Sequence, residues 1–191
     1  MFCLPSGEPV AVRPVTSADQ WRFRRVWAEM SPRTRYLRFH GGHLSEDGPC
    51  IRYLTDVDQQ LHVAHGAILA DHPDHPGVGV FRFIRPRLQA AHAELAITVV
   101  DGYQQQGVGR YLLGCAADEA ARRSIEQFTF RILAGRHRLH AGLQRVGAVV
   151  HGFEDGALVY SLPITSVQDR AATPLPPRRQ TGWPGPVEHA G

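Results

Sequence analysis

The residues best suited to chemistry lie in the stretch DGYQQQGVGRYLL, residues 101–113. It places Gly107 and Gly109 between an apolar segment and a helix-like one, with Arg110 directly after them. N–H groups at a helix start have no acceptor within the helix, and the helix dipole adds partial positive charge there. Glycine also lets the backbone approach a ligand closely, since it has no Cβ. The stretch therefore predicts an anion site, commonly a phosphate site.

Two common phosphate motifs do not fit this turn. The dinucleotide fingerprint GxGxxG needs a glycine three residues after Gly109, where the chain has Leu112. The P-loop needs a lysine, and all 21 basic residues of this chain are arginine. A GxG turn by itself is more often a tight strand-to-helix connection that binds nothing. Planar arginine side chains do suit oxyanion recognition, because they bind such groups through two parallel hydrogen bonds.

The elements around the turn follow from apolar periodicity and from capping residues. Strands are predicted over 9–15, 61–70, 77–85, 92–100 and 127–133, and a closing hairpin over 147–153 and 157–164. Helices are predicted over 16–30, 31–39, 108–124 and 137–146, with a short one near 49–55. Ser31 is the expected N-cap of the second helix, with Pro32 at its first position. In helix 108–124 one apolar stripe is predicted, comprising Val108, Leu112, Leu113, Ala116, Ala117 and Ala120.

The order of these elements predicts an α/β fold of the mixed α+β kind. Consecutive strands in the first half favour an antiparallel meander, and strand–helix–strand in the second half favours a parallel crossover. We expect a central, mixed, twisted sheet with helices on both faces. Residues 1–9 form an N-terminal extension, 10–164 the domain, and 165–191 a proline-rich tail that is expected to be flexible.

Composition narrows the function classes. The formal charge is +3, and the nucleic-acid hypothesis rests only on this mild basicity, without a recognisable module. No apolar run approaches membrane-span length, and the first residues lack the pattern of a signal peptide. Three cysteines without metal-like spacing are expected to be reduced, as in a cytoplasmic protein. Five histidines, His62, His65, His72, His75 and His92, are interpreted as exposed or turn residues, so no metal site is expected.

Residues Gln104 to Gly109 match the pattern [Q/R]xxGx[G/A] of the GNAT acetyltransferase superfamily. The resemblance runs from about Val10 to Ile164. The opening VRPVTSADQWRFRRVWAEMSPRTRYLRFHG resembles the bacterial protein-lysine acetyltransferase subgroup, and LQRVGA (143–148) resembles the last helix of the family and its glycine. The resemblance implies a GNAT fold and acetyl-CoA as cosubstrate, without a metal.

The resemblance also implies roles for individual residues. The turn would hold the coenzyme pyrophosphate through Gln104, Gln105, Gln106, Gly107, Val108, Gly109 and Arg110. The strand end at Val99 and Val100 would pair its backbone with the pantetheine arm and polarise the thioester carbonyl. Glu94, in the strand before the turn, would be the general base that takes the proton of the amine. The alternative is a solvent-facing glutamate paired with Arg82 or Arg85 of the neighbouring strand.

Two positions depart from the family pattern. Many members have an asparagine at the position of Arg136, where it contacts the cofactor, and a tyrosine at the position of Leu143, where it serves as general acid. The general acid is therefore unassigned. Tyr103 is a candidate, although a loop tyrosine more often has a packing role. Because a thiol has a pKa of about 8.5, the thiolate can leave without an acid.

Two functions are compatible with the sequence. The first is an N-acetyltransferase that acts on a primary amine, either a protein lysine or a small molecule. The second is a non-catalytic module that binds an acyl-CoA and acts as a sensor or as a subunit of an assembly, a hypothesis motivated by Arg136 and the proline-rich tail. No membrane partner is expected, and self-association is left open.

Overall fold

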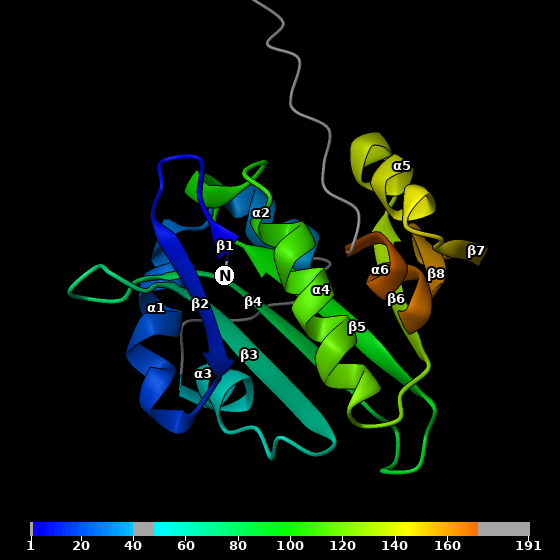
Figure 1. The fold of residues 1–191 in the computed structure, drawn as a ribbon, viewed down its shortest axis with the longest axis horizontal. Helices are drawn as coiled ribbons and strands as arrows, with labels where there is room; N and C mark the ends of the chain where they lie inside the picture. Colours follow the sequence, from blue (N-terminus) through cyan, green and yellow to red (C-terminus); the bar gives the residue numbers. More distant parts are fainter. Residues whose placement is uncertain (1, 40–47, 172–191) are drawn as a thin grey trace, which may run out of the picture.

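An eight-stranded sheet forms the centre of the computed structural model, which describes residues 2–39 and 48–171 (Figure 1). Its strands are β1 (Phe2–Cys3), β2 (Pro9–Pro14), β3 (His62–Leu69), β4 (Gly77–Ile84), β5 (His92–Val99), β6 (Gln127–Leu133), β7 (Val149–Glu154) and β8 (Ala157–Pro163). The helices are α1 (Gln20–Glu29), α2 (Pro32–Phe39), α3 (Gly48–Thr55), α4 (Val108–Ala121), α5 (His137–Arg145) and α6 (Ile164–Ala171). Two 3-10 turns, η1 (Ser17–Asp19) and η2 (Asp101–Tyr103), precede α1 and α4.

The sheet is mixed, as the element order predicts. Its strand order is β1-β2-β3-β4-β5-β6-β8-β7, and every neighbouring pair is antiparallel except β5 and β6. Helix α4 forms the crossover between these two parallel strands. Strand β8 is inserted between β6 and β7, so the closing hairpin predicted from the sequence forms the edge of the sheet.

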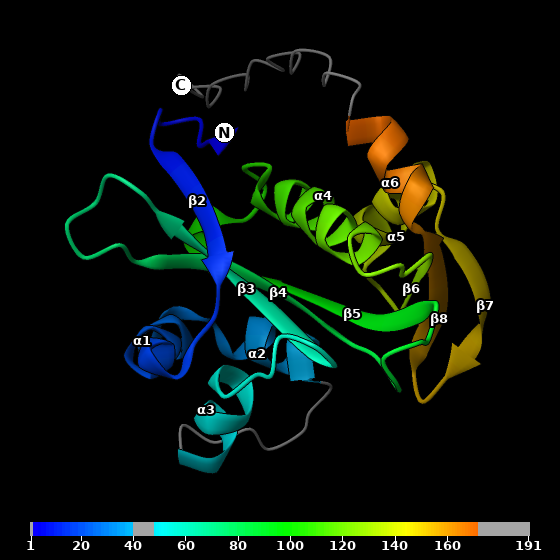
Figure 2. The same ribbon diagram turned by 60° about the horizontal axis from the view of Figure 1, so that its bottom comes forward.

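Helices cover both faces of the sheet. Figure 2 shows α4 and α6 on one side, and α1, α2 and α3 on the other. The predicted stripe of α4 lies in the core, with Val108, Leu112, Ala116, Ala117 and Ala120 all fully buried. Against it pack Phe81 and Phe83 of β4 and Leu95 of β5, which belong to the same core cluster. Because side chains alternate along a strand, the intervening residues of β4 and β5 face α1–α3.

The capping prediction for α2 is confirmed, and a second cap precedes α1. The Ser31 hydroxyl accepts a hydrogen bond from the Thr34 N–H at 3.2 Å, as expected for the N-cap of α2. Ahead of α1, the Asp19 carboxylate accepts from the Thr16 N–H at 3.0 Å in a capping box. The Asp19 side chain also pairs with Arg13 and Arg22, so a buried carboxylate joins β2 to the first helical turn.

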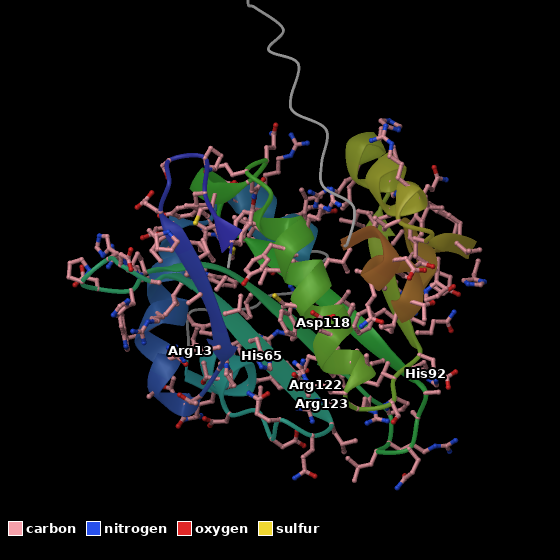
Figure 3. All side chains as sticks on the ribbon, in the orientation of Figure 1. Arg13, His65, His92, Asp118, Arg122 and Arg123 are labelled. Carbon is pink, nitrogen blue, oxygen red and sulfur yellow. The ribbon has the colours of Figure 1, made fainter. Side chains whose placement is uncertain are left out.

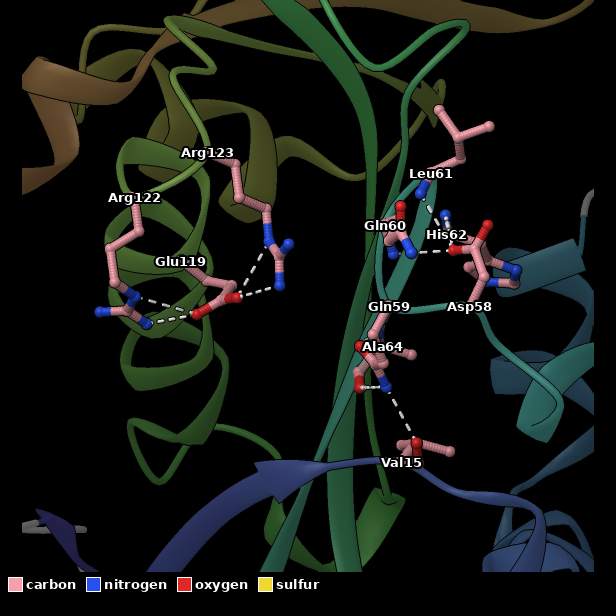
Figure 4. A network of polar contacts seen from close by, with 10 residues as sticks. All are labelled: Val15, Asp58, Gln59, Gln60, Leu61, His62, Ala64, Glu119, Arg122 and Arg123. Carbon is pink, nitrogen blue, oxygen red and sulfur yellow. Dashed lines mark hydrogen bonds and ion pairs between the residues drawn. The ribbon is translucent and has the colours of Figure 1, made fainter.

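A polar turn leads into β3 and aligns it with β2 (Figure 4). The Gln59 side chain donates to the carbonyl oxygens of Val15 and Ala64, at 2.9 and 3.1 Å. The Asp58 carboxylate accepts from the next backbone N–H groups, those of Gln60, Leu61 and His62. These bonds fix the position of His62 at the start of the strand.

The two ends of the domain differ from the sequence prediction. Strand β1 pairs with β2 within the segment treated as an extension. After β8 the chain continues as α6, within the segment treated as a tail; Val167 of this helix is buried and Gln168 bonds to Asp118 of α4. The proline-rich composition obscured this short helix, whose apolar residues Ile164 and Val167 are only three positions apart. The remainder of the predicted tail, 172–191, lies outside the described residues.

Candidate active site

The two parallel strands at the centre of the sheet diverge after Glu94. Strand β5 pairs with β6 only over His92, Ala93 and Glu94, which lie opposite 127–129. Beyond that point β5 continues to Val99 alongside β4 alone, while β6 continues alongside β8. One edge of β5 is therefore left open at the end of the strand that leads to α4. Glu94 occupies the point where the divergence begins.

The loop at the open end presents backbone N–H groups. Gln105 and Gly107 have left-handed backbone conformations, with φ of 60° and 91°, and they curl the chain before α4. The first bond of the helix runs from the Tyr111 N–H to the Gly107 carbonyl at 3.0 Å. The N–H groups of Val108 and Gly109 thus precede the first intrahelical bond and point along the helix axis. The N–H groups are thus directed outward at the N-terminus of α4, where the sequence analysis predicts an anion site.

The three glutamines of the motif serve the loop in different ways. The Gln104 side chain donates to the Val99 carbonyl at 3.1 Å, so it secures the end of β5. The Gln106 side chain donates to the Gly102 carbonyl at 2.7 Å and closes the turn. Gln105 is exposed, and so is Arg110 on the first turn of α4. The side chains of Gln104 and Gln106 therefore shape the loop, and their backbones line it.

Asp101 anchors the same loop to α2, 70 residues earlier in the chain. Its carboxylate accepts from the Ser31 N–H at 3.0 Å, the Ser31 hydroxyl at 2.9 Å and the Thr34 hydroxyl at 2.8 Å. Burial alone would raise the pKa of Asp101, but these bonds outweigh it and lower the pKa below its usual value. Sequence reasoning missed this residue, because an aspartate at a strand end resembles an ordinary turn residue.

Glu94 stands on the face of the sheet that α1–α3 cover. Its side chain is exposed, and its neighbours Ala93 and Leu95 are buried on the opposite face. The nearby cation is Arg38 of α2, whose Nε donates to the Thr98 hydroxyl at 2.9 Å. Burial lowers the pKa of Arg38, and the charge of Glu94 partly opposes this effect. The carboxylate is thus open to solvent, as a base must be to meet an incoming amine.

The alternative that pairs Glu94 with Arg82 or Arg85 is not supported by the contacts of those arginines. Arg82 bonds to the His62 ring at 3.0 Å and to the Leu54 carbonyl at 3.3 Å. Arg85 bonds to the Ala90 carbonyl at 2.7 Å in the turn after β4. Both arginines are buried, with exposed fractions of 4% and 7%.

The structure separates Val99 from Val100. The Val100 N–H donates to the Val78 carbonyl at 3.0 Å, so it is engaged with the neighbouring segment. Backbone groups alternate in direction along a strand, which turns those of Leu95, Ile97 and Val99 toward the open edge. Of the two residues expected to pair with a pantetheine arm, Val99 has the required orientation and the N–H of Val100 does not.

The two departures from the family pattern lie at the start and on one face of α5. Arg136 is the N-cap of this helix and is half-buried; burial lowers its pKa, and the charge of Arg33 adds to the effect. Leu143 packs against the hydrophobic core. Burial, followed by the charges of Glu8 and Glu29, raises the pKa of Tyr103. A phenol shifted in this direction is a weaker proton donor, which argues against Tyr103 as the general acid.

The three arginines of α2 do not form one solvated helix face. Arg35 places its guanidinium 5.5 Å from the Trp27 ring centre, and Arg38 turns toward the sheet. Of the three, Arg33 alone is exposed. The first helix is also mixed, because Trp27 is buried whereas Trp21 is 46% exposed.

The histidines do not converge. Figure 3 shows His65 near Arg122 and Arg123 at the end of α4, well separated from His92 at the start of β5. Within 2–39 and 48–171, no group of three or more histidine, cysteine or acidic side chains is arranged to hold a metal ion. In the same ranges, no helix has the length and apolar character needed to cross a bilayer.

Comparison with known sequences finds curated relatives, whereas no family model matches. The chain is 30% identical over 144 residues to "Acetyltransferase Pat" of Mycolicibacterium smegmatis, which covers 75% of this chain and 42% of the relative. It is 30% identical over 125 residues to "Acetyltransferase PA5475" of Pseudomonas aeruginosa, which covers 65% of this chain and 66% of the relative. The chain therefore spans between two fifths and two thirds of the length of these relatives.

Solved structures share the fold. The GNAT domain of S. lividans PAT superposes with a TM-score of 0.77 at 24% identity, over 85% of this chain and 94% of that one. Spermidine N-acetyltransferase from Vibrio cholerae, solved with CoA and spermine, gives a TM-score of 0.66 at 12% identity, over 83% and 98%. Each match spans most of this chain and nearly all of the compared chain, so this chain shares their overall fold.

Proposed function

Because the chain belongs to the GNAT acetyltransferase superfamily, we propose that it is an N-acyltransferase that transfers an acyl group from acyl-CoA to a primary amine. One observation carries the proposal. The central strands diverge at Glu94, and the N-terminus of α4 lies at the open end of the divergence. The open edge of β5 therefore runs from the exposed carboxylate of Glu94 to the proposed anion site at the start of α4.

The residues at this edge fit a coenzyme A molecule. The loop from Gln104 to Gly109 offers backbone N–H groups and a helix dipole to a pyrophosphate, and Arg110 adds a charge. A Cβ built on Gly109 meets only Val99 Cγ2, at 3.7 Å. The space above this glycine is therefore not needed for packing, which supports close approach of a ligand. The backbone of Val99 would pair with the extended arm.

Acyl-CoA supplies the acyl group as a thioester. The neutral amine nitrogen bonds to the carbonyl carbon as the C–S bond breaks, which yields an amide and a thiol. A lysine-type amine has a pKa of about 10.4, so a base near the acyl group is needed. The Glu94 carboxylate takes the proton that the nitrogen loses, directly or through water. The sulfur leaves as the thiolate of coenzyme A, which takes a proton from solvent and becomes the thiol.

The donor is proposed to be acetyl-CoA, and the acceptor class is a primary amine. Protein lysine is the acceptor suggested by the resemblance of the opening segment. The spermidine N-acetyltransferase of Vibrio cholerae was solved with spermine. A polyamine is a poor fit here, because two guanidinium groups, those of Arg38 and Arg82, line a cavity on the Glu94 face.

The second candidate is a module that binds acyl-CoA without turnover. It is favoured by Arg136 and Leu143, which replace two residues common in the family. The exposed Glu94 at the divergence argues for catalysis.

One assay separates the two candidates. Acetyl-CoA is supplied with amines, peptides and lysate protein, and free thiol is followed while calorimetry measures coenzyme binding. Thiol release that depends on the acceptor is the expected result. Tight coenzyme binding without release above buffer would reject the enzyme and leave the binding module.

A further inference from the structure

We infer that the cavity lined by Arg38 and Arg82, on the face of the sheet that carries Glu94, binds a carboxylate from one of the two reacting partners. The inference rests on the proposed function and extends it to a substrate class. The carboxylate has two sources, an amino acid as the acceptor or an acyl chain that ends in an acid. Both present the same group to the same site.

The cavity has one polar side and apolar walls. Its walls include Phe23, Trp27, Ile51 and Leu54 from the first and third helices, and its polar side includes Arg38, Arg82 and Thr98. The two arginines come from α2 and β4, more than 40 residues apart in the chain. Both guanidinium groups line one small apolar space, and Arg82 is only 4% exposed, which is costly for a charged group.

Arg82 has neutral partners. The Nε2 of His62 accepts its hydrogen bond, so the proton of this ring is on Nδ1, and the Leu54 carbonyl accepts a second bond. No carboxylate pairs with Arg82 within residues 2–39 and 48–171. Three other titratable groups influence the pKa of Arg82. They are the cationic Arg38 and the weakly acidic side chains of Tyr53 and Cys50.

The electrostatic cost of this arrangement is visible in two groups. Burial, followed by the charge of Arg38, lowers the pKa of Arg82 to about 9. Burial, followed by the charge of Arg82, lowers the pKa of His62 to about 4, which keeps the ring neutral near pH 7. A buried charge is usually paired, since desolvation costs several kcal/mol in proteins. We assign to the ligand the negative charge that Arg82 lacks within the described residues.

The register of β4 and β5 sets the distance between Arg82 and Glu94. Arg82 lies opposite Ala96, and Glu94 lies two residues along the same strand on the same face. Diagonal neighbours of this kind are about 7–8 Å apart at Cα. An α-amino acid, or a short acyl chain with a terminal acid, can therefore hold its carboxylate at Arg82 while its reacting atom lies near Glu94.

The test uses two matched pairs of substrates. Leucine is compared with leucinamide as the acceptor of acetyl-CoA, and succinyl-CoA with butyryl-CoA as the donor to leucinamide. Rates are expressed per neutral amine, because the amide has the lower amine pKa. We expect the acid member of one pair to have a kcat/KM at least tenfold higher, and that pair identifies the source. Ratios within twofold in both pairs would overturn the inference.

A binding arm keeps this result separate from the proposed function. Trp27 lines the cavity, so its fluorescence reports occupancy, with Trp27→Phe as the blank. N-acetylleucine should bind at least tenfold more tightly than N-acetylleucinamide. Should all four substrates fail to react while this preference persists, the proposed function fails and the carboxylate site stands. Equal binding of the two compounds would show that the carboxylate does not come from the acceptor.

Variants of two buried arginines complete the test. Arg82→Met should reduce the preference for the acid to within about threefold. Arg85→Met is the matched control, because Arg85 is equally buried and does not line the cavity. It should retain the preference. Equal losses in both variants would contradict the assignment. If Arg82→Met does not fold, the wild-type ratios above decide the question alone.

Discussion

The two faces of the central sheet make their charged sites from different groups. On the α4 face, the anion site consists of consecutive backbone N–H groups at one helix start, within residues 104–110. On the α1–α3 face, the site consists of side chains from three separate segments, represented by Arg38, Arg82 and Glu94. Backbone dipoles carry no net charge and need no counter-ion. The buried guanidinium of Arg82 does need a counter-ion, so the α1–α3 face is suited to a ligand that carries a negative charge.

The largest effect is expected on the side-chain face, from Glu94→Gln. The amide cannot accept the proton, so kcat should fall about 10²-fold or more, a typical acid–base contribution. Coenzyme affinity should remain unchanged, because it belongs to the other face. The measurement is thiol release against pH, with calorimetry for CoA.

Glu126→Gln, at an exposed glutamate, is the control for this change. Wild-type turnover and an unchanged pH profile in the Glu94 variant would show that Glu94 is not the base. The region where β5 and β6 diverge would then serve only to bind substrates.

The second prediction contrasts the two glycines of the backbone face. Gly107→Ala should cost about 1–2 kcal/mol of stability, the usual price of a left-handed residue with a Cβ. That Cβ would also lie 3.3 Å from the Phe2 ring. Gly109→Ala should instead stabilise the chain by up to about 1 kcal/mol, since alanine is favoured within a helix.

Both glycine variants should nonetheless bind CoA more weakly, because each adds a methyl group where the phosphate approaches. Thermal unfolding and calorimetry together separate the two effects. If Gly109→Ala binds CoA as tightly as wild type, the turn is a structural connection and the donor site lies elsewhere.

The third prediction concerns Asp101, which joins the two faces. Asp101→Asn removes the charge that accepts three hydrogen bonds from Ser31 and Thr34, at a cost of about 1–3 kcal/mol in stability. Coenzyme affinity should fall along with it, because the loop loses its anchor. Asp155→Asn, at an exposed turn, serves as the control. Loss of stability with full CoA affinity would show that the loop holds its shape without α2.

The smallest effect is expected from pH, through His62. Its folded pKa is about 4, below the ordinary 6.5. Between these two values the unfolded chain binds a proton that the folded chain does not, so stability falls as the pH falls through this window. His62→Gln should flatten that part of the profile, as measured by thermal unfolding from pH 7 to pH 4. An unchanged slope would mean that His62 is protonated in the fold as readily as in water.

The same contrast between the faces explains how far sequence reasoning reached. The turn before α4 was predictable because its residues are consecutive and glycine spacing reports backbone shape. Most strands and helices were found to within a few residues because apolar periodicity is local. Arg82 was not recognised as a site residue, since an arginine within an apolar strand gives no indication of what surrounds it. Asp101 and Arg38 act through partners about 60–70 residues away, which only the folded chain brings together.

The bonds between Asp101 and Ser31 have a mechanical consequence. They connect the loop before α4 to the first turn of α2, and the same eight-residue helix carries Arg38, whose Nε donates to Thr98 of β5. Any displacement of the loop is therefore expected to displace Arg38 as well, so one short helix couples the backbone site to the side-chain site.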